Sequence, residues 1–139
     1  MFSALFKRIM IASLMALSIA ASSTPTASAT TYTFTIVRLE CIIKQDSIFN
    51  GSDEPRIIVD GITIFLGNNF SNGTVQGIGT SLTVGSQPSI DVWETDPSPD
   101  PDDFIGSFTV TSSTAVGQGV KSKIVGNSNG KYKVFYEVN

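Results

Sequence analysis

Apolar and polar side chains alternate over several short stretches of this chain, and a period of two is typical of β-strands with one buried face. Segments with this alternation, or with a short apolar run, are 31–44, 56–59, 62–66, 78–84, 89–95, 104–111 and 131–138. Residues 115–125 are weakly patterned, and no stretch shows the period of a helix. The pattern therefore predicts an all-β fold, an antiparallel β-sandwich of about seven to eight strands.

Two local signals refine this prediction. In segment 31–44 the apolar positions change phase between Ile36 and Val37, which predicts a β-bulge at that point. Asp60 and Gly61 separate two short apolar runs, and this dipeptide favours a two-residue type I′ turn between paired strands.

The N-terminal segment has the order of a secretory signal. Lys7 and Arg8 precede an apolar run over residues 9–21, and Ala27 and Ala29 form a small-residue cleavage site. The run is shorter than the roughly 20 residues that a transmembrane helix needs. We expect residues 1–29 to be removed, with cleavage after Ala29, and residues 30–139 to form one domain. The expected location is secreted, periplasmic or extracellular.

Composition excludes several classes of function. The chain has 12 acidic and 9 basic residues, and loss of Lys7 and Arg8 with the signal makes the expected domain more acidic still. An acidic domain without a basic run argues against nucleic acid as a partner. No histidine is present, which removes the commonest general base and the Ser-His and Cys-His pairs, so we expect no enzyme activity. The single cysteine, Cys41, falls on an apolar strand face and is interpreted as a buried small hydrophobe.

An acidic segment, residues 93–106, contains most of the candidate metal-binding residues. Its carboxylates are Glu94, Asp96, Asp100, Asp102 and Asp103, with no Lys or Arg among them. Three prolines alternate at 97, 99 and 101, which excludes a helix or a central strand and predicts an extended loop. Several anionic oxygen donors on an irregular loop suit Ca²⁺. The alternative is a solvated acidic loop that binds nothing.

A second acidic loop, residues 45–55, carries Asp46, Asp53 and Glu54, with the apolar pair Ile48 and Phe49 between them. In the simplest sandwich layout both loops follow strands of the same sense, so they are expected to meet at one end of the molecule, where such folds place binding sites.

An EF-hand within the first acidic segment is rejected. If Asp96 began such a loop, Pro101 would stand where the sharp turn needs glycine. Ser107 would stand where a bidentate glutamate is needed.

Both loops resemble the calcium loops of C2 domains. The sequence V-W-E-T-D at residues 92–96, followed by D-F-I-G at 103–106, resembles the third C2 loop, and S-D-E-P at 52–55 with the strand after it resembles the end of the first. The resemblance implies a C2-like fold and a Ca²⁺ site. The residues that it names as ligands are Asp46, Asp53, Glu94, Asp96 and Asp103, with Asp102 or Asp100 as substitutes for Asp103.

Two functional hypotheses follow from the resemblance and the composition. The first is a calcium-dependent binding module whose partner is a phospholipid surface, a glycan or a protein. The second is a structural or accessory domain in which the ion only stabilises the loops or is absent. The expected oligomeric state is a monomer.

Overall fold

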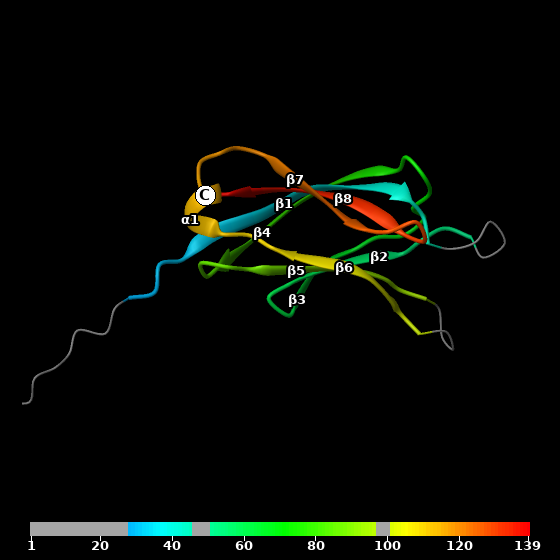
Figure 1. Ribbon diagram of the computed structural model, residues 1–139, viewed down its shortest axis with the longest axis horizontal. Helices are drawn as coiled ribbons and strands as arrows, with labels where there is room; N and C mark the ends of the chain where they lie inside the picture. Colours follow the sequence, from blue (N-terminus) through cyan, green and yellow to red (C-terminus); the bar gives the residue numbers. More distant parts are fainter. Residues whose placement is uncertain (1–27, 46–50, 97–100) are drawn as a thin grey trace, which may run out of the picture.

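The computed structural model describes residues 28–45, 51–96 and 101–139, and it is a sandwich of two four-stranded antiparallel sheets (Figure 1). One sheet has the order β4-β1-β8-β7, and the other has the order β3-β2-β5-β6. The strands are β1 (Tyr32–Ile43), β2 (Pro55–Val59), β3 (Ile62–Leu66), β4 (Val75–Val84), β5 (Ser89–Glu94), β6 (Asp103–Thr109), β7 (Lys121–Gly126) and β8 (Lys131–Val138). The prediction of an antiparallel β-sandwich is therefore confirmed.

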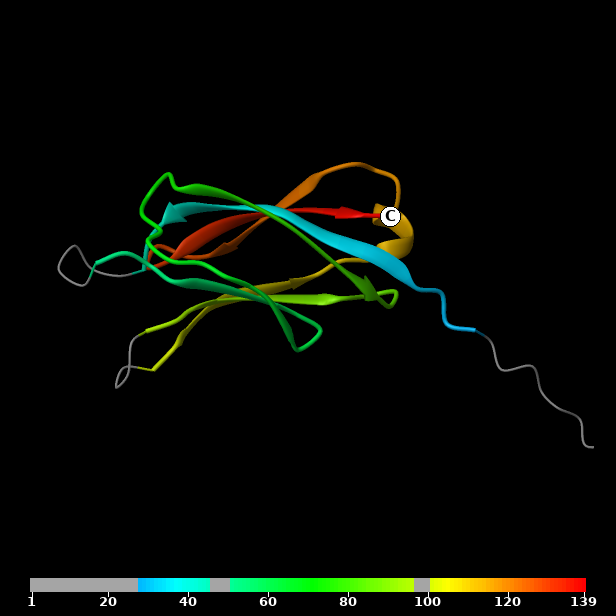
Figure 2. The same ribbon diagram turned by 180° about the vertical axis from the view of Figure 1, so that it is seen from behind.

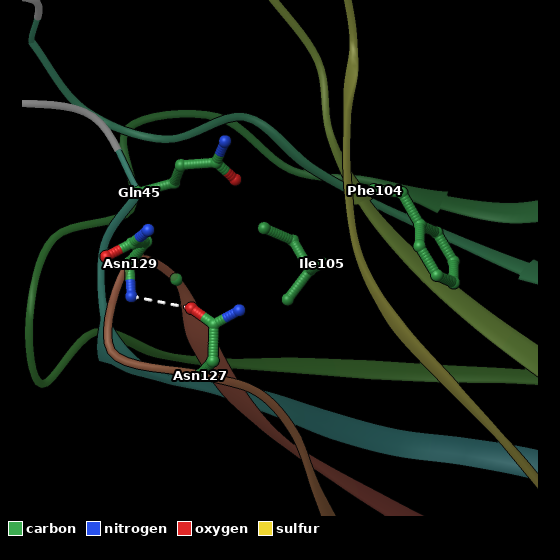
Figure 3. A pocket seen from close by; sticks show the side chains of 6 residues that line it. Gln45, Phe104, Ile105, Asn127 and Asn129 are labelled. Carbon is green, nitrogen blue, oxygen red and sulfur yellow. Dashed lines mark hydrogen bonds between the residues drawn. The ribbon is translucent and has the colours of Figure 1, made fainter.

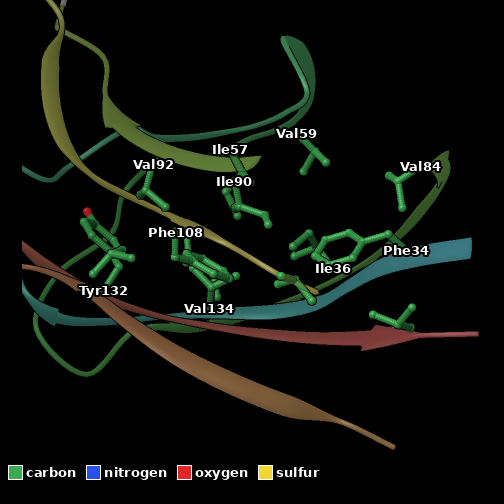
Figure 4. Close-up of a cluster of buried hydrophobic side chains, with 14 of the residues drawn as sticks. Phe34, Ile36, Ile57, Val59, Val84, Ile90, Val92, Phe108, Tyr132 and Val134 are labelled. Carbon is green, nitrogen blue, oxygen red and sulfur yellow. The ribbon is translucent and has the colours of Figure 1, made fainter. Parts of the chain in front are cut away.

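The core lies between the two sheets, where the inward side chains of both meet (Figure 4). In strands such as β5 every second residue faces this layer, and there Ile90 and Val92 have no exposed surface. Fully burying a side chain of this size contributes about 1.5–3 kcal/mol, and the alternation repeats this gain along such strands. Cys41 belongs to the same core and is a free, buried cysteine, which confirms its interpretation as a small hydrophobe.

Both local signals in the sequence are confirmed. The pairing of β1 with β4 and with β8 shifts between Ile36 and Arg38, which is the expected bulge. At the β2–β3 turn Asp60 has φ 48° and Gly61 has φ 81°, and a type I′ turn requires positive φ at both positions. The Asp60 side chain also accepts a 2.8 Å hydrogen bond from the Ser89 N–H, which ties the turn to β5.

Three features were not visible in the pattern. β7 is an edge strand with only Val125 buried, so it has no alternation to read. The short helix α1 (Ser112–Ala115) lies just before it. Phe70 is fully buried although it stands in a stretch rich in Gly and Asn, because a backbone bridge to Asp53 holds it beneath the loops. There its ring lies 6.3 Å from that of Tyr132.

The connections that matter for function gather at one end of the sandwich. Helix α1 and the C-terminus lie at one end, and the β1–β2, β5–β6 and β7–β8 connections leave the sheets at the other (Figures 1 and 2). Contacts between the described parts of the two acidic loops show that they meet there: the Thr95 N–H and the Thr95 hydroxyl both donate to the Glu54 carbonyl, at 3.1 and 2.8 Å.

In the part of the chain that the structure describes, no helix has both the length and the apolar character needed to cross a membrane. The basic residues and apolar run of the expected signal segment lie in residues 1–27, outside the described residues.

Candidate metal centre

The last residue of β5, Glu94, begins the site. Strand alternation puts it on the same face as Ile90 and Val92, so its carboxyl group points into the end of the core and is fully buried. Burying a carboxylate is costly unless polar partners replace water. One partner is the Glu54 N–H of the other acidic loop, which donates to Glu94 Oε1 over 3.2 Å.

Two more carboxylates lie close to Glu94, one through strand pairing and one through chain proximity. Asp103 is the first residue of β6 and lies directly opposite Glu94 in the register, and Asp96 follows Glu94 by two residues. Each of the three offers one carboxylate oxygen, and these oxygens lie within 4.8 Å of one another. Glu94 is buried, Asp96 is half-buried and Asp103 is exposed, so the group runs from the core to solvent.

The donor set fits a calcium ion. Ca²⁺ binds hard oxygen ligands at about 2.3–2.6 Å, so two ligands of one ion are separated by at most about 5 Å. The 4.8 Å limit on the three carboxylate oxygens meets this condition. Three like charges at this spacing repel one another, and a divalent cation between them would replace repulsion by attraction.

Asp53 has a different environment. It is fully buried, and its Oδ2 accepts hydrogen bonds from the Tyr132 hydroxyl at 2.5 Å and from the Gln45 N–H at 2.7 Å. The structure does not include it in the three-carboxylate group. Burial raises the pKa of Tyr132 far above its ordinary value, and the hydrogen bond to Asp53 raises it further. The Tyr132 hydroxyl therefore stays protonated and remains a donor to this carboxylate.

Asp102 is placed on the outer side of the β5–β6 hairpin. Its carboxylate pairs with the Arg56 guanidinium over 2.8 Å, and both side chains are partly exposed. The Arg56 guanidinium in turn lies 5.8 Å from the ring of Trp93. Pairs of this exposure contribute only about 0–1 kcal/mol, so little free energy holds Asp102 in this arrangement.

The remaining acidic candidates, Asp46 and Asp100, lie outside the described residues, as do Ile48 and Phe49.

A further residue, Gln45, reaches the group although no pattern in the sequence points to it. Its side-chain amide donates a hydrogen bond to Asp103 Oδ2. Gln45 also lines a pocket of about 190 Å³, together with Ile105 of β6 and the turn between β7 and β8 (Figure 3). From that turn come Asn127, Asn129 and Gly130. Gln45 could have been found only from the three-dimensional approach of Asp103, which lies 58 residues away in the chain.

The structure is similar to solved structures of C2 domains. A structure of two C2 domains of extended synaptotagmin 2 matches with a TM-score of 0.53 at 14% identity, over 94% of this chain and 48% of that one. A C2 domain of plant extended synaptotagmin 1 matches with a TM-score of 0.52 at 10% identity, over 78% of this chain and 93% of that one. This chain has a C2-like fold.

Further comparisons show how much of each similar protein this chain matches. The C2-like chain also matches human GIVD cytosolic phospholipase A2, with a TM-score of 0.51 at 12% identity, over 80% of this chain and 17% of that one. It spans about half the length of the extended synaptotagmin 2 chain and a small part of the phospholipase. No protein-family model matches it, and no curated protein matches it. At these identities the agreement is one of fold, and the chemistry of the site is argued from this chain's own residues.

Proposed function

We propose that this protein is an exported, non-catalytic C2-like module that binds Ca²⁺ between its two acidic loops. The observation that carries the proposal is the convergence of Glu94, Asp96 and Asp103, whose carboxylate oxygens lie within 4.8 Å of one another at the loop end of the sandwich. The C2-like fold supports it, because the loop that resembles the third C2 calcium loop in sequence is the loop that carries these carboxylates.

The other acidic residues differ in how readily they could bind the ion. Asp102 forms a partly exposed ion pair with Arg56, and breaking such a pair costs little, so Asp102 can turn to an ion. Asp53 is buried, and its Oδ2 already accepts hydrogen bonds from Tyr132 and Gln45, which makes that oxygen the less available ligand. Asp46 belongs to the same proposed set from outside the described residues.

When bound, the ion would supply positive charge at a surface that is otherwise acidic. An anionic or oxygen-rich partner would then be recognised only in the presence of calcium, and the candidate partners are a phospholipid surface, a glycan and a protein. The neighbouring loop carries the apolar pair Ile48 and Phe49, which is suited to contact with an apolar surface.

Thermal unfolding of residues 30–139 with calcium and with chelator tests the site. All eight strands lie within this range. An ion at 100 times its dissociation constant stabilises a protein by about 2.7 kcal/mol, which is a shift of several degrees for a domain of this size. We expect this shift in the parent and its loss in the Asp96→Asn, Asp103→Asn double variant. No shift in the parent would contradict calcium binding.

Sedimentation with vesicles then separates a binding module from a structural one. Vesicles of phosphatidylcholine, with and without about a quarter of phosphatidylserine, are compared in calcium and in chelator. Calcium-dependent sedimentation with the anionic vesicles would identify a lipid surface as the partner. Stabilisation by calcium with no binding to vesicles, to a glycan array or to proteins would favour the alternative, in which the ion only stiffens the loops.

A further inference from the structure

Gln45 connects the two acidic loops through two different groups. Its backbone N–H donates to Asp53 Oδ2 over 2.7 Å, within the acidic loop of residues 45–55. Its side-chain Nε2 donates to Asp103 Oδ2, near the end of the acidic segment of residues 93–106. The position of the Gln45 backbone is thus fixed by a buried carboxylate, and its side chain transmits that position to a carboxylate of the metal group.

The turn between β7 and β8 packs closely against the Gln45 side chain. A Cβ atom placed on Gly130 would lie 3.2 Å from Gln45 Cβ, 3.3 Å from Gln45 Oε1 and 2.9 Å from Ile105 Cδ1. Glycine at this position therefore allows the turn to approach Gln45 more closely than any other residue would. In Figure 3 the Gln45 side chain extends toward Ile105, across the pocket from Asn127.

An amide is well suited to this position. It donates a hydrogen bond to one oxygen of Asp103, which limits the rotation of the carboxylate, and it carries no charge. A lysine would donate equally well but would repel a cation at the same site. Hydrogen-bonded partners of metal-binding carboxylates orient them in this way, and losing such a partner typically costs 10–100-fold in metal affinity.

We propose that Gln45 is the positioning residue of the calcium site, which holds Asp103 in place for the ion and couples the two loops to each other. Gly130 contributes by keeping the Gln45 side chain in position. This proposal rests on the proposed function, since it concerns the same carboxylates.

Calcium titration of residues 30–139 by calorimetry, with Gln45→Met beside the parent, tests the proposal. Methionine has the same length and no donor, so we expect about tenfold weaker binding of Ca²⁺ or more, with an unchanged melting temperature in chelator. Asn129→Ala is the matched control: Asn129 lines the same pocket, but no hydrogen bond joins it to Asp103 among the described residues, so its affinity should equal that of the parent.

Gln45→Lys tests whether the side chain at position 45 lies beside the bound ion. The ammonium group keeps a donor beside Asp103, so the melting temperature in chelator should stay level or rise, whereas Ca²⁺ affinity should fall by more than in Gln45→Met. An affinity of the lysine variant equal to that of the parent would show that the side chain at position 45 does not lie beside the ion, and that result would overturn the proposal.

A double-mutant cycle tests the part played by Gly130. Gly130→Ala should weaken Ca²⁺ binding in the parent and have no further effect in Gln45→Met, because it acts through the same side chain. Additive losses would remove Gly130 from the proposal. Equal affinities of the parent and Gln45→Met would overturn the proposal for Gln45 while leaving calcium binding intact, and a parent that binds no calcium would overturn both.

Discussion

The hydrogen bond between Tyr132 and Asp53 links the β1–β2 connection to the core of the sandwich. Both side chains are fully buried, and the hydroxyl of one donates to the carboxylate of the other over 2.5 Å. Tyr132→Phe removes the donor and leaves the carboxylate less well satisfied, so we expect the free energy of unfolding to fall by about 1.5–3 kcal/mol. Urea denaturation measures this loss.

Tyr136→Phe is the control for that experiment. Tyr136 packs between Phe34 and Phe108, with ring centroids 5.6 and 5.7 Å away, and its hydroxyl has no hydrogen-bond partner in the described part of the chain. Its loss should change the free energy of unfolding by less than about 0.5 kcal/mol. Equal losses in the two variants would show that ring packing, rather than the bond to Asp53, accounts for the effect.

The thiol of Cys41 provides a second test at the scale of one residue. Burial and the nearby charge of Asp53 raise its pKa from 9.0 to about 11. Since the thiolate is the reactive form, native protein at pH 8 should react with a thiol reagent far more slowly than unfolded protein, and the rate should increase as the pH approaches 11. Rapid labelling of the native protein at about pH 8 would contradict this.

The raised pKa of Cys41 also has a consequence for stability. Between pH 9 and 11 the native protein retains a proton that the unfolded chain loses. The contribution of this group is therefore fully present below pH 9 and is lost as the pH rises toward 11.

At the scale of elements, the β5–β6 hairpin both builds the site and closes the sandwich. Its register sets Asp103 opposite Glu94, and two residues further on Ile105 packs against the core. Gly106 then allows β7 of the other sheet to approach: a Cβ atom at Gly106 would lie 3.2 Å from the Gly126 nitrogen and 3.5 Å from Val125 Cβ. One hairpin thus determines the spacing of the carboxylates and the contact between the two sheets.

Gly106→Val tests the second of these roles, the contact between the two sheets. Its side chain would push β7 away from β6, and overpacking of this kind costs about 1–3 kcal/mol in the free energy of unfolding. Ser107→Val adds the same side chain to an exposed position on the same strand and should leave stability within about 0.5 kcal/mol of the parent. Guanidinium denaturation of both variants makes the comparison, and equal stabilities would show that the approach of β7 is not tightly packed.

The strand β8 could be predicted from its own alternation, whereas β7 could not. β8 alternates because Tyr132, Val134 and Val138 all enter the core. In β7 only Val125 enters the core, and Ile124 is more than half exposed. The sequence of β7 therefore shows no alternation of apolar and polar residues. An edge strand such as β7 is placed by its hydrogen bonds to the neighbouring strand more than by burial of its own side chains. The local sequence does not show which strand that neighbour is.

The acidic residues show the same division. Glu94, Asp96 and Asp103 could be grouped from the sequence because a single hairpin holds them close together along the chain. The present partners of Asp53 and Asp102 could not, because Tyr132 and Arg56 reach them from strands 79 and 46 residues away. The sequence shows which carboxylates are available, whereas long-range packing determines how each one is held.

At the scale of the whole molecule, every strand of the described sandwich follows the N-terminal segment in the chain. β1 begins at Tyr32, and all eight strands lie between Tyr32 and Val138. Removal of residues 1–29 would thus leave every strand complete. It would also remove Lys7 and Arg8, so that the domain released is more acidic than the full chain and more dependent on a cation to offset its charge.

Intact-mass measurement of the exported protein tests cleavage directly. Signal peptidase requires small residues before the cut, so we expect a mature chain that begins at Thr30. Replacing Ala27 and Ala29 by leucine should block processing and leave the protein at its full 14.8 kDa in the membrane fraction. Replacing Ser28, which lies between them, is the matched control and should leave cleavage unchanged. A parent that keeps its first 29 residues would contradict cleavage after Ala29.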